Sequence, residues 1–460
     1  MDSGFLTASD RHENEPSKRQ KSNEGQDTIS NLPDFIIGHI LSFLPIKDAV
    51  RTSVLSQRWI YTWTFVSELS FIDKKSIYCL SEIEKSRFMN FVCRVLLHLN
   101  TASIKTFSLS LSEKYDSYII NQWISSVSNR RVKRISVCSL QECNISCYPI
   151  FKCQSLEELV LGMDQSIIQF PSFVRLSSLT VLHLITTFRN GMKVTCYSSN
   201  ESKELTLNFP VLREYKTQYC TWLGVKCVTL EAPLLKVVVI INSRLTRPDV
   251  SHAEIKICAS HITKFRYAGI VSLQTILLDA HIAEAEISIL TLKGLTVQQM
   301  GIFVRKIFSI NVERLQLYLT VNQDLAGMKH CLADIPAFGM LRHLQLFYVV
   351  SEILFGLLLK SPCLQTLVIM VVIESDEEQM NFSIVPDCFL STLKEVKFDD
   401  FMGGKHELSF AKFVMEKGQV LESISFSCSQ QLHGAALEKV KEEIFLVKRN
   451  FTIEFSAYFG

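Results

Sequence analysis

The chain has 460 residues, of which 47% are hydrophobic and 20% charged, and 48 basic against 46 acidic side chains give a formal net charge of +2. This composition is globular, and the length exceeds what one compact core usually supports, so we expect several domains or a repeat array. Because a nucleic-acid-binding surface normally needs a basic excess, the charge balance argues against nucleic acid and favours another protein as the partner.

Residues 1–26 carry almost no aliphatic side chains and many charged or small polar ones. Such a segment buries too little apolar surface to offset the entropy of ordering, so we expect a disordered tail. It lacks the features of a secretory signal, and the longest apolar stretch, residues 367–373, is too short to span a bilayer. We therefore expect a soluble protein of the nucleus or cytoplasm, with no membrane partner and with its fourteen cysteines as free thiols.

Residues 27–70 show three short helical patterns in succession. The first begins at Pro33, ends at Pro45, and has apolar side chains at helical spacing, namely Ile36, Ile37, Ile40, Leu41 and Leu44. Residues 48–54 predict a second helix, and Ser56 is the expected N-cap of a third, in which Trp59 and Trp63 lie one turn apart. So small a module has surplus apolar surface, which serves either as a docking face or as the cap of a repeat array.

The segment NLPDFIIGHILSFLPIKDAVRTSVLSQRWIYTW, residues 31–63, resembles an F-box of the form found in large plant protein families. The Leu32-Pro33 opening, the centre at 40–45 and the close at 54–59 carry the resemblance. It implies docking to a Skp-type adaptor and, through it, to a cullin–RING ubiquitin ligase. By match to the family pattern, the core and docking face of the module comprise Leu32, Pro33, Ile36, Ile40, Leu44, Pro45, Val54, Leu55 and Trp59.

A repeat of the form apolar-x-x-apolar-x-apolar follows the module. Clear copies begin at Leu156, Leu179, Leu212, Leu235, Ile262, Val312, Leu341, Leu364, Leu393 and Leu421; looser copies begin at Ile104 and Val132, and a degenerate one at Ile282. The fourth and sixth positions point to one face of a strand, and several of the connecting segments (88–99, 123–127 and 353–358) have helical patterns. This predicts an α/β fold: a leucine-rich-repeat solenoid over residues 71–385, with a parallel sheet, helical returns and a horseshoe shape.

The C-terminal region, residues 386–460, continues the pattern. Residues 388–426 resemble the FBD segment that ends many plant F-box/leucine-rich-repeat proteins, through Cys388, Leu393, Lys394, Val396, Phe401, Gly403, Glu407, Leu408 and Leu421. We expect two further repeats here, closed by a helix over 435–447 and a final strand over 451–455.

The sequence offers no catalytic constellation. It contains no GxSxG, HExxH, CxxC or phosphate-binding glycine motif. The nearest approach to a metal site is Cys138, Cys143, Cys147 and Cys153, whose spacing is too loose for typical zinc ligands, so we interpret them as core and loop thiols. We expect His183 and His343 to be polar surface residues rather than general bases. These observations predict a non-catalytic protein without a cofactor.

The third, fifth and seventh template positions should face the concave side of the sheet, opposite the core. In the middle and late repeats these positions offer positive charge and apolar or aromatic anchors, at Lys216, Lys264, Arg266, Arg314, Tyr318, His343, Phe347 and Met370. One hypothesis is that they hold a target protein for a ubiquitin ligase; the plain alternative is that strands simply need outward-facing residues. A different function, as a small-molecule co-receptor of the same ligase class, would need a deep basic pocket formed by Lys264, Arg266 and Arg314.

Overall fold

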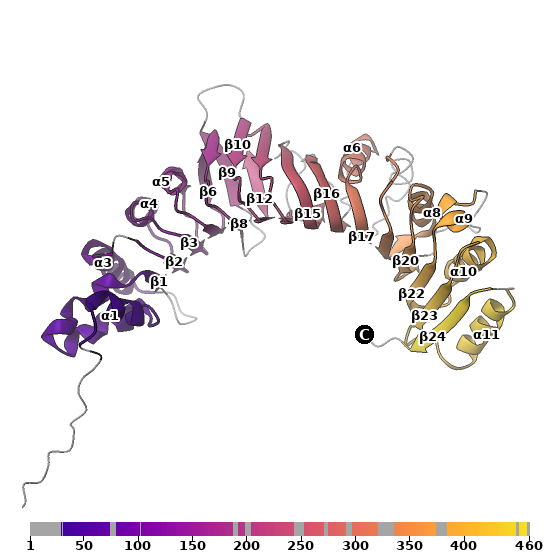
Figure 1. Cartoon of the computed structure of the whole chain (residues 1–460), viewed down its shortest axis with the longest axis horizontal. Coiled ribbons are helices and arrows are strands. Elements are labelled where there is room, and N and C mark those ends of the chain that lie inside the picture. The colour runs from indigo at the N-terminus through magenta and orange to yellow at the C-terminus, as the bar shows by residue number, and fades with distance from the viewer. Residues whose placement is uncertain are drawn as a thin grey trace, which may run out of the picture.

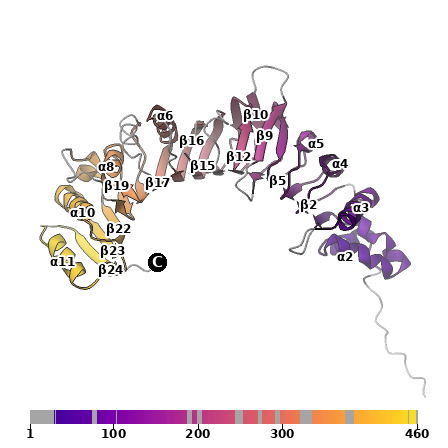
Figure 2. The same ribbon diagram turned by 180° about the vertical axis from the view of Figure 1, so that it is seen from behind.

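The computed structural model describes residues 29, 31–73, 80–101, 103–186, 192–197, 204–242, 253–270, 275–290, 297–320, 335–373, 384–447 and 450–457. The tail predicted for residues 1–26 lies outside these ranges. The described chain forms an arch in which strands line the inner side and helices cover the outer side at both ends (Figure 1). Seen from behind, the same arrangement is clear, with the N-terminal helices at one foot of the arch (Figure 2).

The concave side is a single parallel sheet in which nearly every strand pairs with the next repeat. Its members, in spatial order, are β1 (Glu68–Ile72), β2 (Thr106–Leu111), β3 (Arg134–Ser139), β5 (Glu158–Met163), β8 (Val181–Ile185), β11 (Glu214–Gln218), β14 (Val237–Ile241), the second halves of β15 (Glu254–Ile270) and β16 (Thr275–Leu290), β17 (Asn311–Thr320), β18 (His343–Phe347), β20 (Thr366–Ile369), β22 (Glu395–Phe401), β23 (Ser423–Cys428) and β24 (Thr452–Ala457).

The predicted repeat is confirmed strand by strand. Each template copy, including the degenerate one at Ile282, leads into one strand of the concave sheet. The fourth and sixth positions of the repeat are buried in the core, and the alternate positions are partly exposed on the concave surface. In β11, for example, the buried residues are Tyr215 and Thr217. The period-two alternation of a strand therefore separates core from concave surface throughout the arch.

Helices form the returns near the two ends of the arch. At the N-terminal end these are α3 (Glu82–His98), α4 (Ser117–Ser128) and α5 (Tyr148–Lys152); toward the C-terminus they are α6 (Val297–Ile307), α8 (Ser351–Leu359), α9 (Asp387–Ser391), α10 (Lys405–Lys417) and α11 (Gly434–Phe445). The helical returns predicted over 88–99, 123–127 and 353–358 correspond to α3, α4 and α8. Ser81 and Glu84 form a capping box that fixes the start of α3.

In the middle of the arch the returns are strands. The strands β4 (Ile145–Ser146), β6 (Ile167–Pro171), β9 (Met192–Tyr197) and β12 (Cys220–Leu223) form a second parallel sheet on the outer side. A third ladder joins β7 (Phe173–Arg175), β10 (Glu204–Asn208) and β13 (Cys227–Glu231) to the first halves of β15 and β16. Because these returns alternate apolar and polar residues and are rich in β-branched ones, they favour strands over helices.

The N-terminal module, residues 31–66, comprises α1 (Asp34–Leu41), α2 (Ile46–Arg51) and three short 3-10 turns, η1 (Thr52–Val54), η2 (Gln57–Ile60) and η3 (Thr62–Phe65). The third predicted helix is thus two 3-10 turns, and Ser56 makes no side-chain cap bond. Trp63 is buried, and the two turns let it enter the core while Trp59 lies at its margin, which one straight helix would not require.

One hydrophobic core runs through the whole described chain, from Ile37 in α1 to Ile444 in α11. The module joins the solenoid directly, because β1 follows η3 after only two residues. Backbone bonds reinforce the junction: Asn100 N donates to Thr64 O at 2.9 Å and Lys105 N donates to Ser67 O at 2.8 Å. None of the described helices has the length and apolar character needed to span a membrane.

Candidate functional site

The N-terminal module presents large apolar side chains to solvent. None of the nine residues predicted for its core and docking face is fully buried: Leu32, Ile36 and Trp59 are half-buried and Pro33, Ile40, Leu44, Pro45, Val54 and Leu55 are exposed. Val54 is 86% exposed and Leu55 66% exposed. Contiguous apolar exposure of this kind in a folded domain marks an interaction surface.

Helix α1 divides its apolar residues between two faces. Ile37 and Leu41, four residues apart, are buried in the core. Ile40 points outward, and Phe43 continues that outer face with 79% of its surface exposed. Phe43 was absent from the predicted set, although its spacing of three residues from Ile40 would have placed it on the same helical face.

Polar contacts hold the exposed face in shape. The Arg58 guanidinium in η2 donates to the backbone oxygen of Leu32 and lies 3.5 Å from the Asp34 carboxylate, which ties the last turns to the start of α1. Gly38 allows α1 to contact η3, because a Cβ built at this position would lie 2.5 Å from the Cβ of Phe65. The outward side chains therefore stand on a rigid support.

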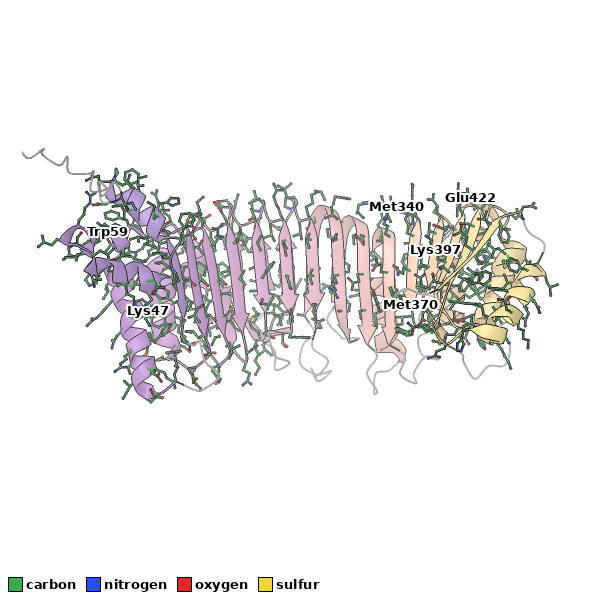
Figure 3. All side chains as sticks on the ribbon, turned by 90° about the horizontal axis from the view of Figure 1, so that it is seen from below. Lys47, Trp59, Met340, Met370, Lys397 and Glu422 are labelled. Carbon is green, nitrogen blue, oxygen red and sulfur yellow. The ribbon has the colours of Figure 1, made fainter. Side chains whose placement is uncertain are left out.

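The concave face gathers most of the predicted target-binding residues on neighbouring strands, and Figure 3 looks into this face, where Met370 and Lys397 are labelled. The strands β15 to β18 carry Lys264, Arg266, Arg314, Tyr318, His343 and Phe347. Met370 directly follows β20, next to this group, whereas Lys216 lies on β11 and is separated from it by β14.

The cations of this group alternate with carboxylates. Glu284 of β16 is the register neighbour of Lys264 on one side and of Arg314 on the other. Arg266 forms an ion pair with Glu286 at 3.2 Å, and Arg266 lines a pocket that neither Lys264 nor Arg314 reaches. The arrangement is a ladder of alternating charge, unlike the deep basic pocket that a small anionic ligand would require.

Two aromatic residues of the group form a stack. The rings of Tyr318 and Phe347 lie 3.8 Å apart with 10° between their planes. Phe347 is only 8% exposed although it lies outside the main core, so it supports Tyr318 and offers little surface of its own, contrary to its predicted role as an anchor. Burial raises the pKa of Tyr318, and the nearby Glu286 carboxylate adds to this shift.

The two histidines lie in polar surroundings on the concave side. His183 Nε2 is 2.9 Å from Glu214 Oε1 on the next strand. Burial lowers the pKa of His343, and the adjacent Arg314 guanidinium lowers it further, whereas Glu395 acts in the opposite direction.

The four closely spaced thiols do not converge. Cys138 lies in β3, whereas Cys143, Cys147 and Cys153 are buried in the following return. Burial raises the pKa of the Cys143 thiol to about 11 and raises that of Cys147 further. Among the described residues no group of three or more His, Cys, Asp or Glu side chains could hold a metal ion.

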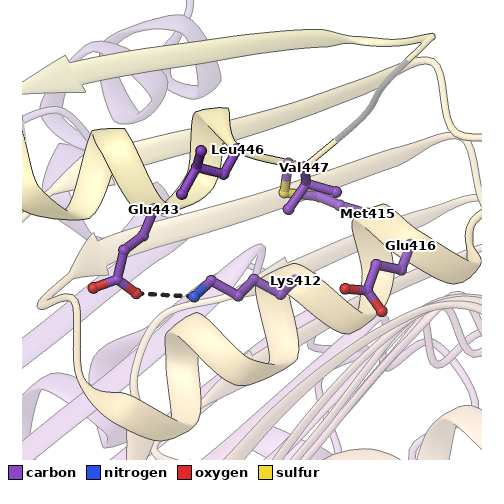
Figure 4. Close-up of a pocket in the computed structure, with 6 residues that line it drawn as sticks. All are labelled: Lys412, Met415, Glu416, Glu443, Leu446 and Val447. Atoms are coloured by element: carbon purple, nitrogen blue, oxygen red, sulfur yellow. Dashed lines mark hydrogen bonds and ion pairs between the residues drawn. The ribbon is translucent and has the colours of Figure 1, made fainter.

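A second pocket, of about 540 Å³, lies between α10 and α11 on the outer side of the C-terminal end (Figure 4). Lys412 and Glu443 form an ion pair of 2.8 Å across it, and Met415, Leu446 and Val447 supply an apolar wall. It contains none of the residues predicted from sequence.

Comparison with known proteins accounts for both ends of the chain. The family model described as F-box domain matches residues 29–69, and the model described as FBD matches residues 379–426. An F-box/FBD/LRR-repeat protein of Arabidopsis thaliana is 27% identical over 437 residues, which cover 89% of this chain and 91% of that protein. The chain is thus similar, over most of its length, to a plant F-box/FBD/leucine-rich-repeat protein.

Other relatives show the same similarity. A second Arabidopsis thaliana F-box/FBD/LRR-repeat protein is 27% identical over 90% of this chain and 96% of its own length. An Arabidopsis thaliana F-box/LRR-repeat protein is 42% identical over 115 residues, which is 24% of this chain and 30% of the relative. The N-terminal module with its exposed apolar face is thus the F-box, and the solenoid ends in the FBD.

Most residues that mark the FBD are structural. Five of the six apolar markers of this segment are buried in the core of the last repeats, namely Cys388, Leu393, Val396, Phe401 and Leu421, and the sixth, Leu408, is half-buried against it. Gly403 has a positive φ of 73°, a conformation that glycine adopts at little cost, and an added Cβ there would lie 3.0 Å from Val440. The segment therefore completes the solenoid.

Glu407 is the charged marker at the centre of the FBD, and it is 3% exposed. Its Oε2 accepts hydrogen bonds from the backbone N–H groups of Met402, Gly403 and Gly404, at 3.0, 2.9 and 3.3 Å. Its Oε1 lies 3.5 Å from Val372 N, in the preceding repeat. Burial raises the pKa of Glu407, and the backbone donors oppose this shift.

Proposed function

We propose that this protein is a non-catalytic substrate-recognition subunit of a Skp–cullin–F-box ubiquitin ligase. Its F-box docks a Skp-type adaptor, and the concave face of the repeats holds a target protein. The observation that carries this proposal is the exposed apolar face of the F-box, around Phe43, Val54 and Leu55, in a module whose own core is already filled by Ile37 and Leu41. Burial of such a face by a partner is the dominant source of association free energy.

The continuous core supports the same function. A ligase subunit of this kind needs no active-site residue, because holding a target near the conjugating enzyme raises its effective concentration. Proximity of this kind is most effective when the docking module and the target surface keep a fixed geometry. Here β1 follows the F-box directly and pairs with β2 along its whole length, so the two parts form one body.

Capture of a recombinant Skp-type adaptor by the full chain tests the docking half of the proposal. The variant carries Val54→Ala and Leu55→Ala; both side chains are exposed, so truncation costs the free protein little stability. The matched control carries Leu97→Ala and Leu446→Ala, which truncate two similarly exposed side chains outside the F-box, 78% and 82% exposed.

We expect the F-box double variant to lose at least about tenfold in adaptor affinity, because each buried methyl group contributes on the order of 0.8 kcal/mol. The control should bind like the wild type. Equal affinity of the F-box variant and the wild type would contradict the proposed docking face. Loss of binding in the control as well would point to non-specific apolar association.

A further inference from the structure

A pocket of about 420 Å³ opens on the concave face across the ends of β14 to β17. It is lined by Tyr219, Ile241, Asn242, Arg266, Ala268, Gly269, Glu286, Ser288 and Tyr318. Only Arg266 and Tyr318 of these were predicted as target-binding residues. The other lining residues could not be grouped from the repeat template alone. They lie at the ends of several strands, and only the order of these strands in the sheet brings them together.

One row of register neighbours crosses this pocket. Ile241 pairs with Ala268, Ala268 with Ser288, Ser288 with Tyr318, and Tyr318 with Phe347. The row therefore runs from an aliphatic side chain through two small ones to two aromatic ones. The small residues form the floor of the pocket, and Ile241 and Tyr318 form opposite walls.

The stacking of Tyr318 on Phe347 at one end of the row fixes the orientation of the Tyr318 ring, which forms one wall of the pocket. Because the rings of Tyr318 and Phe347 are 3.8 Å apart and nearly parallel, each ring stands with its face toward the neighbouring strand. Phe347 covers one face of Tyr318. The opposite face of Tyr318 is directed along the row toward Ser288, into the pocket.

The row leaves room for another ring. Adjacent strands lie about 4.8 Å apart, so Tyr318 and Ile241 are separated by three spacings, or about 14 Å. Stacked aromatic side chains prefer centroid separations of about 4.5–7 Å. A ring above Ser288 would therefore continue the stack, and the space above Ala268 remains for the backbone that carries it.

The charges at the rim favour a neutral ring. Arg266 and Glu286 pair with each other at 3.2 Å, so together they present no net charge to the pocket. A guanidinium or a carboxylate in the slot would therefore gain no net attraction from this pair to offset the loss of its own hydration. A neutral aromatic side chain avoids the cost of desolvating a charge.

We propose that this slot receives an aromatic side chain from a segment of the bound target protein, as the third ring of the Phe347–Tyr318 stack. The inference rests on the proposed function as a target-binding subunit and names the chemistry of the target. Aromatic side chains are common anchors in protein interfaces because they bury a large area at low entropic cost.

The test uses the full chain and three small probes, N-acetyl-tryptophan amide, N-acetyl-leucine amide and N-acetyl-arginine amide, with binding followed by ligand-observed NMR. From the efficiency of small ligands we expect the tryptophan probe to bind with a Kd of about 0.1–1 mM. We expect the other two probes to bind at least about fivefold more weakly. The leucine probe has no aromatic ring, and the arginine probe has no aromatic ring and is also charged. Equal binding of the three probes would overturn the inference.

Two variants locate the site. Ser288→Phe fills the slot from within, and Tyr318→Leu removes the platform while keeping apolar bulk; each should weaken the tryptophan probe by at least about fivefold. Ser425→Phe makes the same substitution on β23 of the same sheet, away from the pocket, and should bind like the wild type. Unchanged binding in Ser288→Phe, or equal loss in Ser425→Phe, would refute the slot.

Adaptor capture, measured on the same proteins, separates this inference from the proposed function. Each variant should capture the adaptor like the wild type, since the substitutions lie outside the F-box. If the adaptor binds and the tryptophan probe does not, the inference alone fails. If the wild type does not bind the adaptor, the proposed function fails whatever the probes show.

Discussion

Replacement of Glu407 tests whether the hydrogen bonds of this FBD residue stabilise the packing of the last repeats. This buried carboxylate joins the loop before α10 to β21 (Val372–Ile373) of the preceding repeat. Glu407→Ala removes the acceptor for three well-placed N–H groups, whereas Glu407→Gln can keep them by placing its amide oxygen where Oε2 stands. Glutamine then loses only the 3.5 Å contact to Val372.

The structure gives the expected magnitudes. The three donors are partly buried, so each loses about 1 kcal/mol when its acceptor is removed. Together with the lost packing of the side-chain stem, the alanine variant should destabilise the C-terminal repeats by about 3–4 kcal/mol. The glutamine variant should stay within about 1 kcal/mol of the wild type near neutral pH.

Hydrogen–deuterium exchange with mass spectrometry measures this locally. Because repeats contact mainly their neighbours, the alanine variant should accelerate exchange in peptides from residues 384–457 by about 100- to 1,000-fold and leave the N-terminal repeats unchanged. A glutamine variant as unstable as the alanine variant would refute the reasoning, because it would show that the charge, and not the acceptor geometry, holds the loop.

The same pair of variants predicts a pH dependence. Burial raises the pKa of Glu407 above its ordinary value of 4.5, so the folded chain binds this proton more tightly than the unfolded chain. The stabilising contribution of the group is therefore complete below about pH 4.5 and declines as the pH rises through the raised pKa. Glutamine does not titrate. The difference in unfolding free energy between the wild type and Glu407→Gln should therefore shrink as the pH rises from about 4.5 through the raised pKa. An advantage that grows with pH would contradict the assigned direction.

Two further outcomes follow from packing and burial. Gly38→Ala should lower the melting temperature of the F-box region and weaken adaptor capture, because its Cβ would lie 2.5 Å from a carbon of the facing turn; unaltered melting and capture would contradict this contact. In the native chain at pH 8, the exposed thiol of Cys363 should react with iodoacetamide, whereas that of Cys220, whose pKa burial raises to about 12, should react only after unfolding. Peptide mapping distinguishes the two, and rapid labelling of Cys220 in the native chain would contradict its burial.

The repeat was predictable because each strand carries its own local signal. The template at Leu212, for example, predicts that Tyr215 and Thr217 face the hydrophobic core, without reference to any other repeat. The strand returns in the middle were harder to predict. Segments such as residues 204–208 are short, and their conformation is decided by pairing with β7 and β13, which belong to other coils.

The candidate sites show the same limit. The apolar stripe of α1 was visible in the sequence, yet periodicity alone did not separate the buried Ile37 from the exposed Ile40, because the two differ only in which neighbour packs on them. The slot on the concave face could not be found from one repeat. Ser288 acquires its role only because strand register places it beside Tyr318.

The proposed docking face of the F-box and the proposed target-binding face of the solenoid are connected through one continuous hydrophobic core. The F-box leaves Val54 and Leu55 exposed, yet buries Trp63 in the hydrophobic core that continues through the solenoid, so the two parts share one packed interior. Protein interiors are close-packed and resist shear, and the parallel sheet extends this rigidity from β1 to β24. A target anchored beside Tyr318 would then be held at a set distance and orientation from the adaptor, and only the free segments of the target itself would have to move to bring a lysine to the ligase.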